Sequence, residues 1–218
     1  MPKVLELFCG TGSVGNVCRK RGYEVISLDI LEKNKPSICC DILKWDYKKF
    51  SENFIPDFIW CSPPCQTFSL AGHSKHRTKM DMNPKTEEAK IGLQILEKTV
   101  EIIKYFLMLN PNLKFAIENP RGLMRYCDVL KEFDRTTGCY CLYGSNFMKP
   151  TDIWNNFNCS LVMCKYKTKT NYTFCHHDSM CNIIPSRGVN NAKLTDKYSI
   201  PYFFIENILD QAEINDLI

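Results

Sequence analysis

Apolar runs and stretches of helical periodicity alternate along the chain. Short apolar runs predict strands at residues 3–8, 24–29, 58–61 and 113–117. A helix is predicted at 14–21, and a longer one at 86–109, where apolar residues recur every three to four positions. Those positions are Ile91, Ile95, Leu96, Thr99, Ile102, Ile103 and Phe106. Strands that alternate with helices predict an α/β fold with a mostly parallel sheet.

Two segments near the C-terminus depart from this alternation. Residues 155–197 are polar, rich in Cys, Asn and Lys, and without periodicity, so we expect them to be loop-like. The following stretch, 200–218, predicts an amphipathic closing helix that begins near Pro201. Its apolar positions are Phe204, Ile205, Ile208, Leu209 and Ala212.

Composition narrows the class of protein. The 218 residues are 44% hydrophobic and 24% charged, as in globular proteins, and the net charge of +4 permits a nucleic-acid partner without requiring one. No run of 18 apolar residues suggests a membrane span, and the N-terminal residues lack a signal-peptide pattern. We therefore expect the thirteen cysteines to be reduced thiols in an intracellular compartment, the cytoplasm or nucleus of a cell or a virus-infected host.

A glycine-rich loop follows the first predicted strand, where parallel sheets bind their ligands. Residues 10–15 read Gly-Thr-Gly-Ser-Val-Gly and lead into the first helix. Asp29 ends the second strand and Asp41 follows it, so their carboxylates could accept hydrogen bonds from a ribose and an adenine amino group. The pattern fits an ordinary strand–helix turn equally well. It does not separate a dinucleotide from S-adenosylmethionine, which leaves a dehydrogenase open.

A proline–cysteine motif follows the strand at 58–61. Pro63 and Pro64 donate no ladder hydrogen bond, so the strand must end before Cys65 and expose its thiol. A thiol with a lowered pKa or a nearby base is a strong nucleophile. An isolated cysteine, however, is more often a small buried hydrophobe.

Three motifs together resemble the DNA (cytosine-5) methyltransferase family, and most closely its short viral and phage members. They are Phe-Cys-Gly-Thr-Gly at 8–12, Pro-Pro-Cys-Gln-Thr-Phe-Ser at 63–69 and Glu-Asn-Pro at 118–120. The resemblance covers residues 3–154 well and the rest loosely. It implies a Rossmann-like S-adenosylmethionine-dependent methyltransferase fold, with helices on both faces of the sheet and a small loop-rich module.

The resemblance also implies which residues bind S-adenosylmethionine. Phe8 would pack on the adenine, Asp29 would hold the ribose and Asp41 the adenine amino group. The remaining residues would shape the pocket, with Glu6 on the methionine side. The full implied set is Glu6, Phe8, Gly10, Gly12, Asp29, Asp41 and Pro63.

The implied catalytic residues are Cys65, Glu118 and Lys149. Addition of the Cys65 thiolate to carbon 6 of cytosine makes carbon 5 nucleophilic, and Glu118 would neutralise the charge that develops at ring nitrogen 3. Lys149 would bond the cytosine carbonyl oxygen. Because both faces of the base must be reached, the cytosine must be flipped out of the duplex.

The loop after the nucleophile closes over the target nucleotide in the family. Lys75, Arg77 and Lys79 could meet phosphates of double-stranded DNA there. Gln66 and Ser69, within the cysteine motif, complete the implied nucleic-acid contacts. Without its position after Cys65, the basic loop would be read as an ordinary solvated surface.

Two motifs depart from the family pattern. Aligned on Tyr143-Gly144, Lys149 and Thr151 take the positions of the two arginines of the family's Gln-x-Arg-x-Arg motif. The family's late asparagine is also missing from Tyr-Ser-Ile-Pro at 198–201. Both changes concern the active-site geometry.

The recognition segment is short. We divide the chain into a catalytic core at 1–154, a reduced target-recognition segment at 155–197 and a C-terminal helix at 198–218 that packs back on the core. So small a segment implies a short or weakly specified target site, or a partner protein that supplies specificity. It also holds Cys159, Cys164, Cys175, His176, His177 and Cys181. These lack a Cys-x-x-Cys knuckle, so we expect unliganded thiols and assign no metal site, with structural zinc as the alternative.

Two other functions remain open at this point. Cytosine in RNA, such as transfer RNA, is an alternative substrate. An inactive methyltransferase-like protein that only binds nucleic acid is the other, although such a protein would not need both Cys65 and Glu118.

Overall fold

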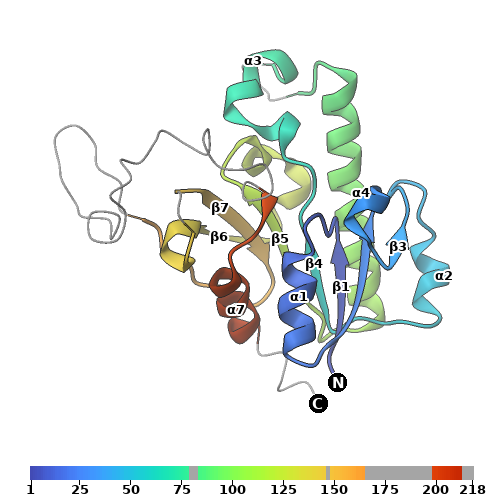
Figure 1. The fold of residues 1–218 in the computed structure, drawn as a ribbon. Helices are drawn as coiled ribbons and strands as arrows, with labels where there is room; N and C mark the ends of the chain where they lie inside the picture. Colours follow the sequence, from blue (N-terminus) through green and yellow to red (C-terminus); the bar gives the residue numbers. More distant parts are fainter. Residues whose placement is uncertain (79–82, 146–147, 165–197, 213–218) are drawn as a thin grey trace.

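The computed structural model describes residues 1–78, 83–145, 148–164 and 198–212. In this part of the chain seven strands form one sheet in the order β3-β2-β1-β4-β5-β7-β6 (Figure 1). The strands are β1 (Lys3–Leu7), β2 (Glu24–Asp29), β3 (Ile38–Cys39), β4 (Phe58–Cys61), β5 (Lys114–Pro120), β6 (Asp134–Cys139) and β7 (Pro150–Asn155). The pairs among β1 to β5 are parallel, whereas β7 is antiparallel to both of its neighbours. The predicted α/β fold with a mostly parallel sheet is confirmed.

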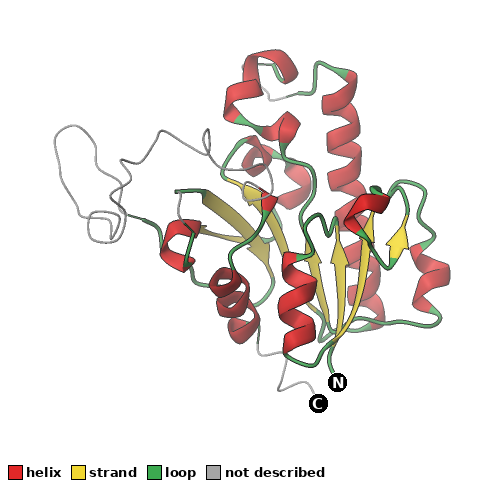
Figure 2. Cartoon of the chain, in the orientation of Figure 1, coloured by secondary structure: helices red, strands yellow, loops and turns green. Residues whose placement is uncertain are grey.

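Helices cover both faces of this sheet, as predicted (Figure 2). Helices α1 (Ser13–Lys20) and α7 (Tyr202–Gln211) lie on one face, and α4 (Glu87–Leu109) lies on the other. The shorter helices are α2 (Tyr47–Ser51) and α3 (His73–His76). Single 3₁₀ turns are η1 (Glu32–Asn34), η2 (Gln66–Phe68), η3 (Leu70–Gly72), η4 (Leu123–Tyr126), η5 (Asp128–Leu130) and η6 (Tyr140–Tyr143). None of the helices in the described residues is both long and apolar enough to cross a membrane.

Side chains of β1 alternate between two apolar cores. Leu5 and Leu7 belong to the core beneath α4, while Val4 packs with residues of α1 and α7. A strand buried on both faces is typical of the middle of a parallel sheet. Because its neighbours alternate in this way, Glu6 shares the α1 side with Val4.

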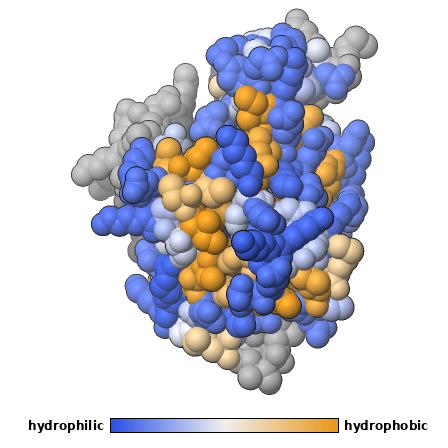
Figure 3. All heavy atoms as spheres, turned by 90° about the vertical axis from the view of Figure 1, so that its right-hand side faces the viewer, coloured by the Kyte–Doolittle hydropathy of each residue, from blue (hydrophilic) through white to orange (hydrophobic). Residues whose placement is uncertain are grey.

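Helix α4 begins and ends close to the predicted bounds. The side chain of Thr86 accepts a hydrogen bond from the backbone N–H of Ala89 and caps the first turn. Of the apolar positions that gave the helical spacing, Ile91 is 47% exposed, whereas Leu96, Thr99, Ile102, Ile103 and Phe106 are buried. On the outer side of the helix, Lys90 and Lys98 form exposed ion pairs with acids of the same helix. Figure 3 shows the side of the molecule that carries β3, α2 and α4, where hydrophilic residues surround a narrow apolar strip.

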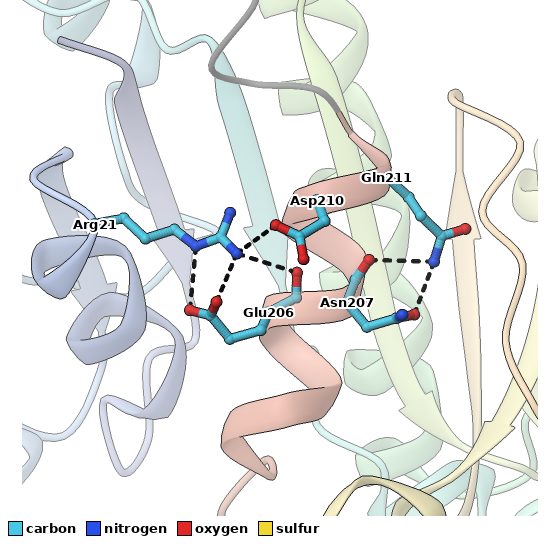
Figure 4. Close-up of polar contacts among 5 residues, drawn as sticks. All are labelled: Arg21, Glu206, Asn207, Asp210 and Gln211. Carbon is cyan, nitrogen blue, oxygen red and sulfur yellow. Dashed lines mark hydrogen bonds and ion pairs between the residues drawn. The ribbon is translucent and has the colours of Figure 1, made fainter.

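Helix α7 confirms the predicted closing helix up to the end of the described residues. Its five predicted apolar positions are all buried, while residues 213–218 lie outside the described part. Arg21, directly after α1, donates to Glu206 at 2.6 Å and to Asp210 at 2.5 Å, which ties α7 to α1 (Figure 4). The C-terminal helix therefore packs on the same face of the sheet as α1.

Strands β6 and β7 were not predicted, because their buried residues are partly polar. Asp152 of β7 is fully buried, and Arg125 holds both of its carboxylate oxygens, at 2.6 and 2.5 Å. The Thr137 hydroxyl of β6 also donates to Asp152. A buried acid with such partners is stable in a strand, although no apolar alternation marks it.

The beginning of the expected recognition segment lies against the core. The backbone N–H of Cys139 donates to the Val162 carbonyl at 3.1 Å, and Cys159 and Cys164 are both buried. Residues 165–197 lie outside the described part, so the loop-like character expected for them stays a prediction.

Candidate active site

The glycine-rich loop leaves β1 through a series of left-handed backbone conformations. Phe8, Gly10 and Gly12 have φ angles of 62°, 50° and 70°. The backbone N–H groups of Phe8 and Cys9 both donate to the Leu28 carbonyl, which fixes the loop to β2. Side chains other than glycine rarely adopt such φ values, so Gly10 and Gly12 are needed for backbone conformation. Gly12 then caps the N-terminus of α1.

The two predicted nucleotide-binding acids are held by backbone N–H groups. Asp29 is 7% exposed and accepts from Gly10 at 2.9 Å and from Leu31 at 2.8 Å. Asp41 is half-buried and accepts from Leu43 at 3.0 Å. A carboxylate oxygen has more than one lone pair, so both acids can also accept from a ligand hydroxyl or amino group.

Glu6 is a buried carboxyl group beneath the start of α1. It is 2% exposed, and its Oε2 has no hydrogen-bond partner among the described residues. Burial raises the pKa of Glu6 to about 7, although backbone N–H groups of α1 and Arg19 favour the charged form. Helix α1 approaches closely here, because a Cβ on Gly15 would lie 2.5 Å from Glu6 Oε2. A buried acceptor of this kind suits a positively charged ligand group.

Cys65 lies at the end of the loop that follows β4. Asn119 of β5 donates from Nδ2 to the Pro63 carbonyl at 2.9 Å, so the proline segment is tied to the neighbouring strand. The Cys65 side chain is half-buried. Burial, and then the charge of Glu118, raise the pKa of its thiol, while Lys149 acts in the opposite direction. The charges of Glu118 and Lys149 therefore both act on the Cys65 thiol, in opposite directions.

Glu118 lies within β5, which runs through Pro120 and is longer than predicted. Glu118 is 5% exposed, and its Oε1 accepts a hydrogen bond from the hydroxyl of Tyr140 at 2.8 Å. Lys149 Nζ lies 4.8 Å from the centroid of the Tyr140 ring. No sequence signal marked Tyr140, because 22 residues separate it from Glu118 and its turn has no recognised motif.

One pocket of about 710 Å³ brings these groups together. This volume is within the range of small-molecule sites. Its lining includes ten of the predicted site residues: Glu6, Phe8, Gly10, Asp29, Asp41, Pro63, Cys65, Gln66, Glu118 and Lys149. Tyr198 and Ile200, from the segment where the family's asparagine is missing, also line it. The buried acceptor Glu6 and the acids Asp29 and Asp41 fit a ligand that has both a cationic group and a nucleoside. S-adenosylmethionine is such a ligand.

The predicted nucleic-acid contacts are only partly exposed. Gln66 is exposed at the pocket, and Ser69 and Lys75 are exposed outside its lining. Arg77 is 3% exposed, donates from Nε to the Thr67 carbonyl and lies 4.5 Å from the centroid of the Phe68 ring. In this structure Arg77 therefore packs inward and does not face a phosphate. Lys79 lies outside the described residues.

The expected cysteine and histidine cluster is mostly outside the described part as well. Cys159 and Cys164 are the two members within it. Among the described residues, no group of three or more His, Cys, Asp or Glu side chains could hold a metal ion. The described cysteines form no disulfide.

Comparison with known proteins gives a consistent set of relatives. Residues 3–126 match the family model of C-5 cytosine-specific DNA methylases. A protein of Frog virus 3 (isolate Goorha), named as a probable DNA (cytosine-5)-methyltransferase, is 32% identical over 165 residues, which are 71% of this chain and 70% of that protein.

Two solved structures have a similar fold. A protein of an E. coli prophage, named as a DNA modification methyltransferase, is 16% identical with a TM-score of 0.51, over 71% of this chain and 46% of that one. The Entamoeba histolytica methyltransferase EhMeth is 17% identical with a TM-score of 0.51, over 77% of this chain and 57% of that one. The chain thus spans about half the length of these solved proteins.

Proposed function

The chain belongs to the C-5 cytosine-specific DNA methylase family, and from that premise we propose that it transfers a methyl group from S-adenosylmethionine to carbon 5 of a cytosine in DNA. The observation that carries the proposal is the single pocket that is lined both by the acids Glu6, Asp29 and Asp41 and by Cys65 and Glu118. A cofactor held by those acids would lie in the same cavity as the nucleophile. This arrangement favours the enzyme over an inactive binding protein, and nothing in a dehydrogenase site calls for it.

The acids and the glycine loop hold the cofactor. S-adenosylmethionine, when bound, supplies an electrophilic methyl group on a positively charged sulfur. Glu6 accepts from the ammonium group of its methionine part, Asp29 from the ribose hydroxyls and Asp41 from the adenine amino group. Phe8 and Pro63 contribute apolar surface, and Gly10 and Gly12 let the backbone approach.

Cys65 and Glu118 activate the cytosine. Cys65 Sγ forms a bond to carbon 6, its proton leaves to solvent, and Glu118 gives a proton to ring nitrogen 3 so that no net negative charge stays on the ring. Lys149 favours the thiolate and can bond the carbonyl oxygen of the base. After transfer, a base removes the carbon 5 proton, the Cys65 thiolate leaves carbon 6, and ring nitrogen 3 returns its proton to Glu118, which restores a neutral base. Because both faces of the base must be reached, the cytosine is flipped out of the duplex and into the pocket.

Exposed side chains near the pocket bind the DNA. Gln66, Ser69 and Lys75 are placed to contact it from the exposed surface, with Lys79 beyond the described residues. For Arg77 the sequence-based role requires that it leave its contact with Phe68, so it is the least supported of the set. A recognition segment as short as residues 155–197 would read few base edges. We therefore expect a short or weakly specified target, or a partner protein that supplies specificity, and a reducing compartment that keeps the thiols intact.

Methyl transfer from labelled S-adenosylmethionine tests the proposal. The protein is incubated with duplex DNA and with folded RNA, each substrate is digested, and 5-methylcytosine is identified by mass spectrometry. We expect label in DNA, its loss in Cys65→Ser, and its retention in Cys39→Ser, which changes an exposed thiol outside the pocket lining. Label in RNA alone would overturn the DNA assignment. No label in either, with cofactor binding intact, would indicate an inactive binding protein.

A further inference from the structure

Tyr140 is the residue that contacts Glu118 most directly among the described side chains outside the predicted site. It is fully buried, and its hydroxyl donates to Glu118 Oε1 at 2.8 Å. Tyr140 is not part of the pocket lining, and its hydroxyl reaches the site through Glu118. We propose that Tyr140 is a positioning residue for Glu118, which holds one carboxyl oxygen so that the other faces the base. This inference rests on the proposed function.

The hydrogen bond has a defined use in the proton transfer. With Oε1 accepting from Tyr140, the proton that Glu118 gives to ring nitrogen 3 is carried on Oε2. When that proton has left, the Tyr140 hydroxyl stabilises the carboxylate that remains. Burial, and then Glu118, raise the pKa of Tyr140 well above its usual value. The hydroxyl therefore stays protonated and remains a donor at every working pH.

Tyr140 interacts with one residue of the altered arginine motif. Thr151, at one of the two arginine positions, is uncharged and fully buried, and its hydroxyl donates to the Lys149 carbonyl at 3.2 Å. Its short side chain also interacts with the Tyr140 hydroxyl. Tyr140 thus interacts with Thr151 and presents a hydrogen-bond donor to Glu118.

Two elements fix the ring of Tyr140. Phe204 of α7 packs edge-on against it, with ring centroids 4.9 Å apart and an interplanar angle of 62°. The backbone N–H of Tyr140 donates to the Lys149 carbonyl at 3.2 Å, next to β7. Helix α7 is itself held by the Arg21 ion pairs shown in Figure 4. A donor whose rotamer is fixed by packing costs little reorganisation when the charge develops.

The test compares Tyr140→Phe with Tyr143→Phe. Both rings lie in the same turn and pack against Phe204, but the Tyr143 hydroxyl accepts from the Val162 backbone at 3.0 Å. Rates of methyl transfer are measured in a single turnover, together with dissociation constants for S-adenosylmethionine and DNA. We expect Tyr140→Phe to be slower by about 10- to 100-fold with binding constants unchanged, since it loses a hydrogen bond to a charged group. Tyr143→Phe should stay within about threefold of the wild type.

A double-substitution cycle separates positioning from a structural effect. If Tyr140 acts through Glu118, Tyr140→Phe has no further effect on the residual rate of Glu118→Gln. Equal rates for wild type and Tyr140→Phe, equal slowing in both Phe variants, or full additivity with Glu118→Gln would each overturn the inference. A wild type that binds the cofactor but transfers no methyl group would contradict the proposed function itself.

Discussion

Two buried carboxyl groups in the same pocket differ in their partners. Glu118 accepts a hydrogen bond from the Tyr140 hydroxyl, whereas Glu6 Oε2 has no hydrogen-bond partner among the described residues. The first arrangement suits a group that gives up a proton during the reaction. The second suits a group that binds a cationic ligand. At the scale of single residues, environment therefore assigns two roles to one side-chain type.

The affinity for S-adenosylmethionine should depend on pH through Glu6. Because burial raises the pKa of Glu6 to about 7, only part of the population is charged at neutral pH. A cationic ligand requires the charged form, so we expect affinity to rise about fivefold from pH 6 to 7 and about twofold from pH 7 to 8. Calorimetric titration measures this. Glu6→Gln should bind more weakly without this rise, and Glu24→Gln, at an exposed site, should keep it. Equal pH dependence in all three proteins would contradict the role of Glu6.

The reactivity of Cys65 should depend on Lys149. The Lys149 charge lowers the pKa of Cys65, against burial and Glu118, which raise it. Replacing it in Lys149→Met should therefore move the rising limb of the pH–rate profile to higher pH and slow the reaction at pH 7 by on the order of tenfold. Lys149→Arg retains the charge and should keep the position of the limb. Identical profiles for Met and Arg variants would show that Lys149 does not act on the thiol.

At the scale of elements, the strand ends were predictable and the last two strands were not. Strands β1, β2 and β4 are marked by apolar runs, and the motifs after them carry Gly10, Asp29 and Cys65 to one edge of the sheet. Strand β7 escaped prediction because Asp152 is buried in it, satisfied by Arg125 from a distant turn. Tyr140 was not identified from the sequence for the same reason, because its contact with Glu118 exists only once β5 and η6 are adjacent. Local periodicity does not record partners that tertiary structure supplies.

Helix α7 supports the active site through Phe204, so its attachment should matter for stability. Arg21 forms ion pairs with Glu206 and Asp210. The Arg21 side chain is only 15% exposed and the Glu206 side chain only 23%. We expect Arg21→Met to lower the free energy of unfolding by about 1–3 kcal/mol. The matched change Lys90→Met removes an ion pair that is 52% and 78% exposed, and it should cost under about 0.5 kcal/mol. Denaturant titration measures both, and equal losses would contradict the role assigned to the Arg21 pairs.

At the scale of the whole molecule, one pocket draws on residues from distant parts of the chain. The pocket lining draws on β1, β2 and β5, on the loop after β4, on Lys149 before β7, and on Tyr198 and Ile200 before α7. Residues from both ends of the chain thus form one cavity. We expect the proposed chemistry to take place in this cavity, and sequence discrimination to depend on residues 155–197 or on a partner protein.

Trapping with 5-fluorocytosine is the measurement that tests the covalent mechanism most directly. Fluorine at carbon 5 cannot be removed as a proton, so the enzyme stays bonded to the base after methyl transfer. The protein is incubated with S-adenosylmethionine and duplexes that carry the analogue in varied contexts, and adducts are resolved on denaturing gels. The mechanism predicts an adduct that requires the cofactor, maps to Cys65 by mass spectrometry and is absent in Cys65→Ser. An adduct that persists in Cys65→Ser, or methyl transfer to cytosine with no adduct on the analogue, would contradict it.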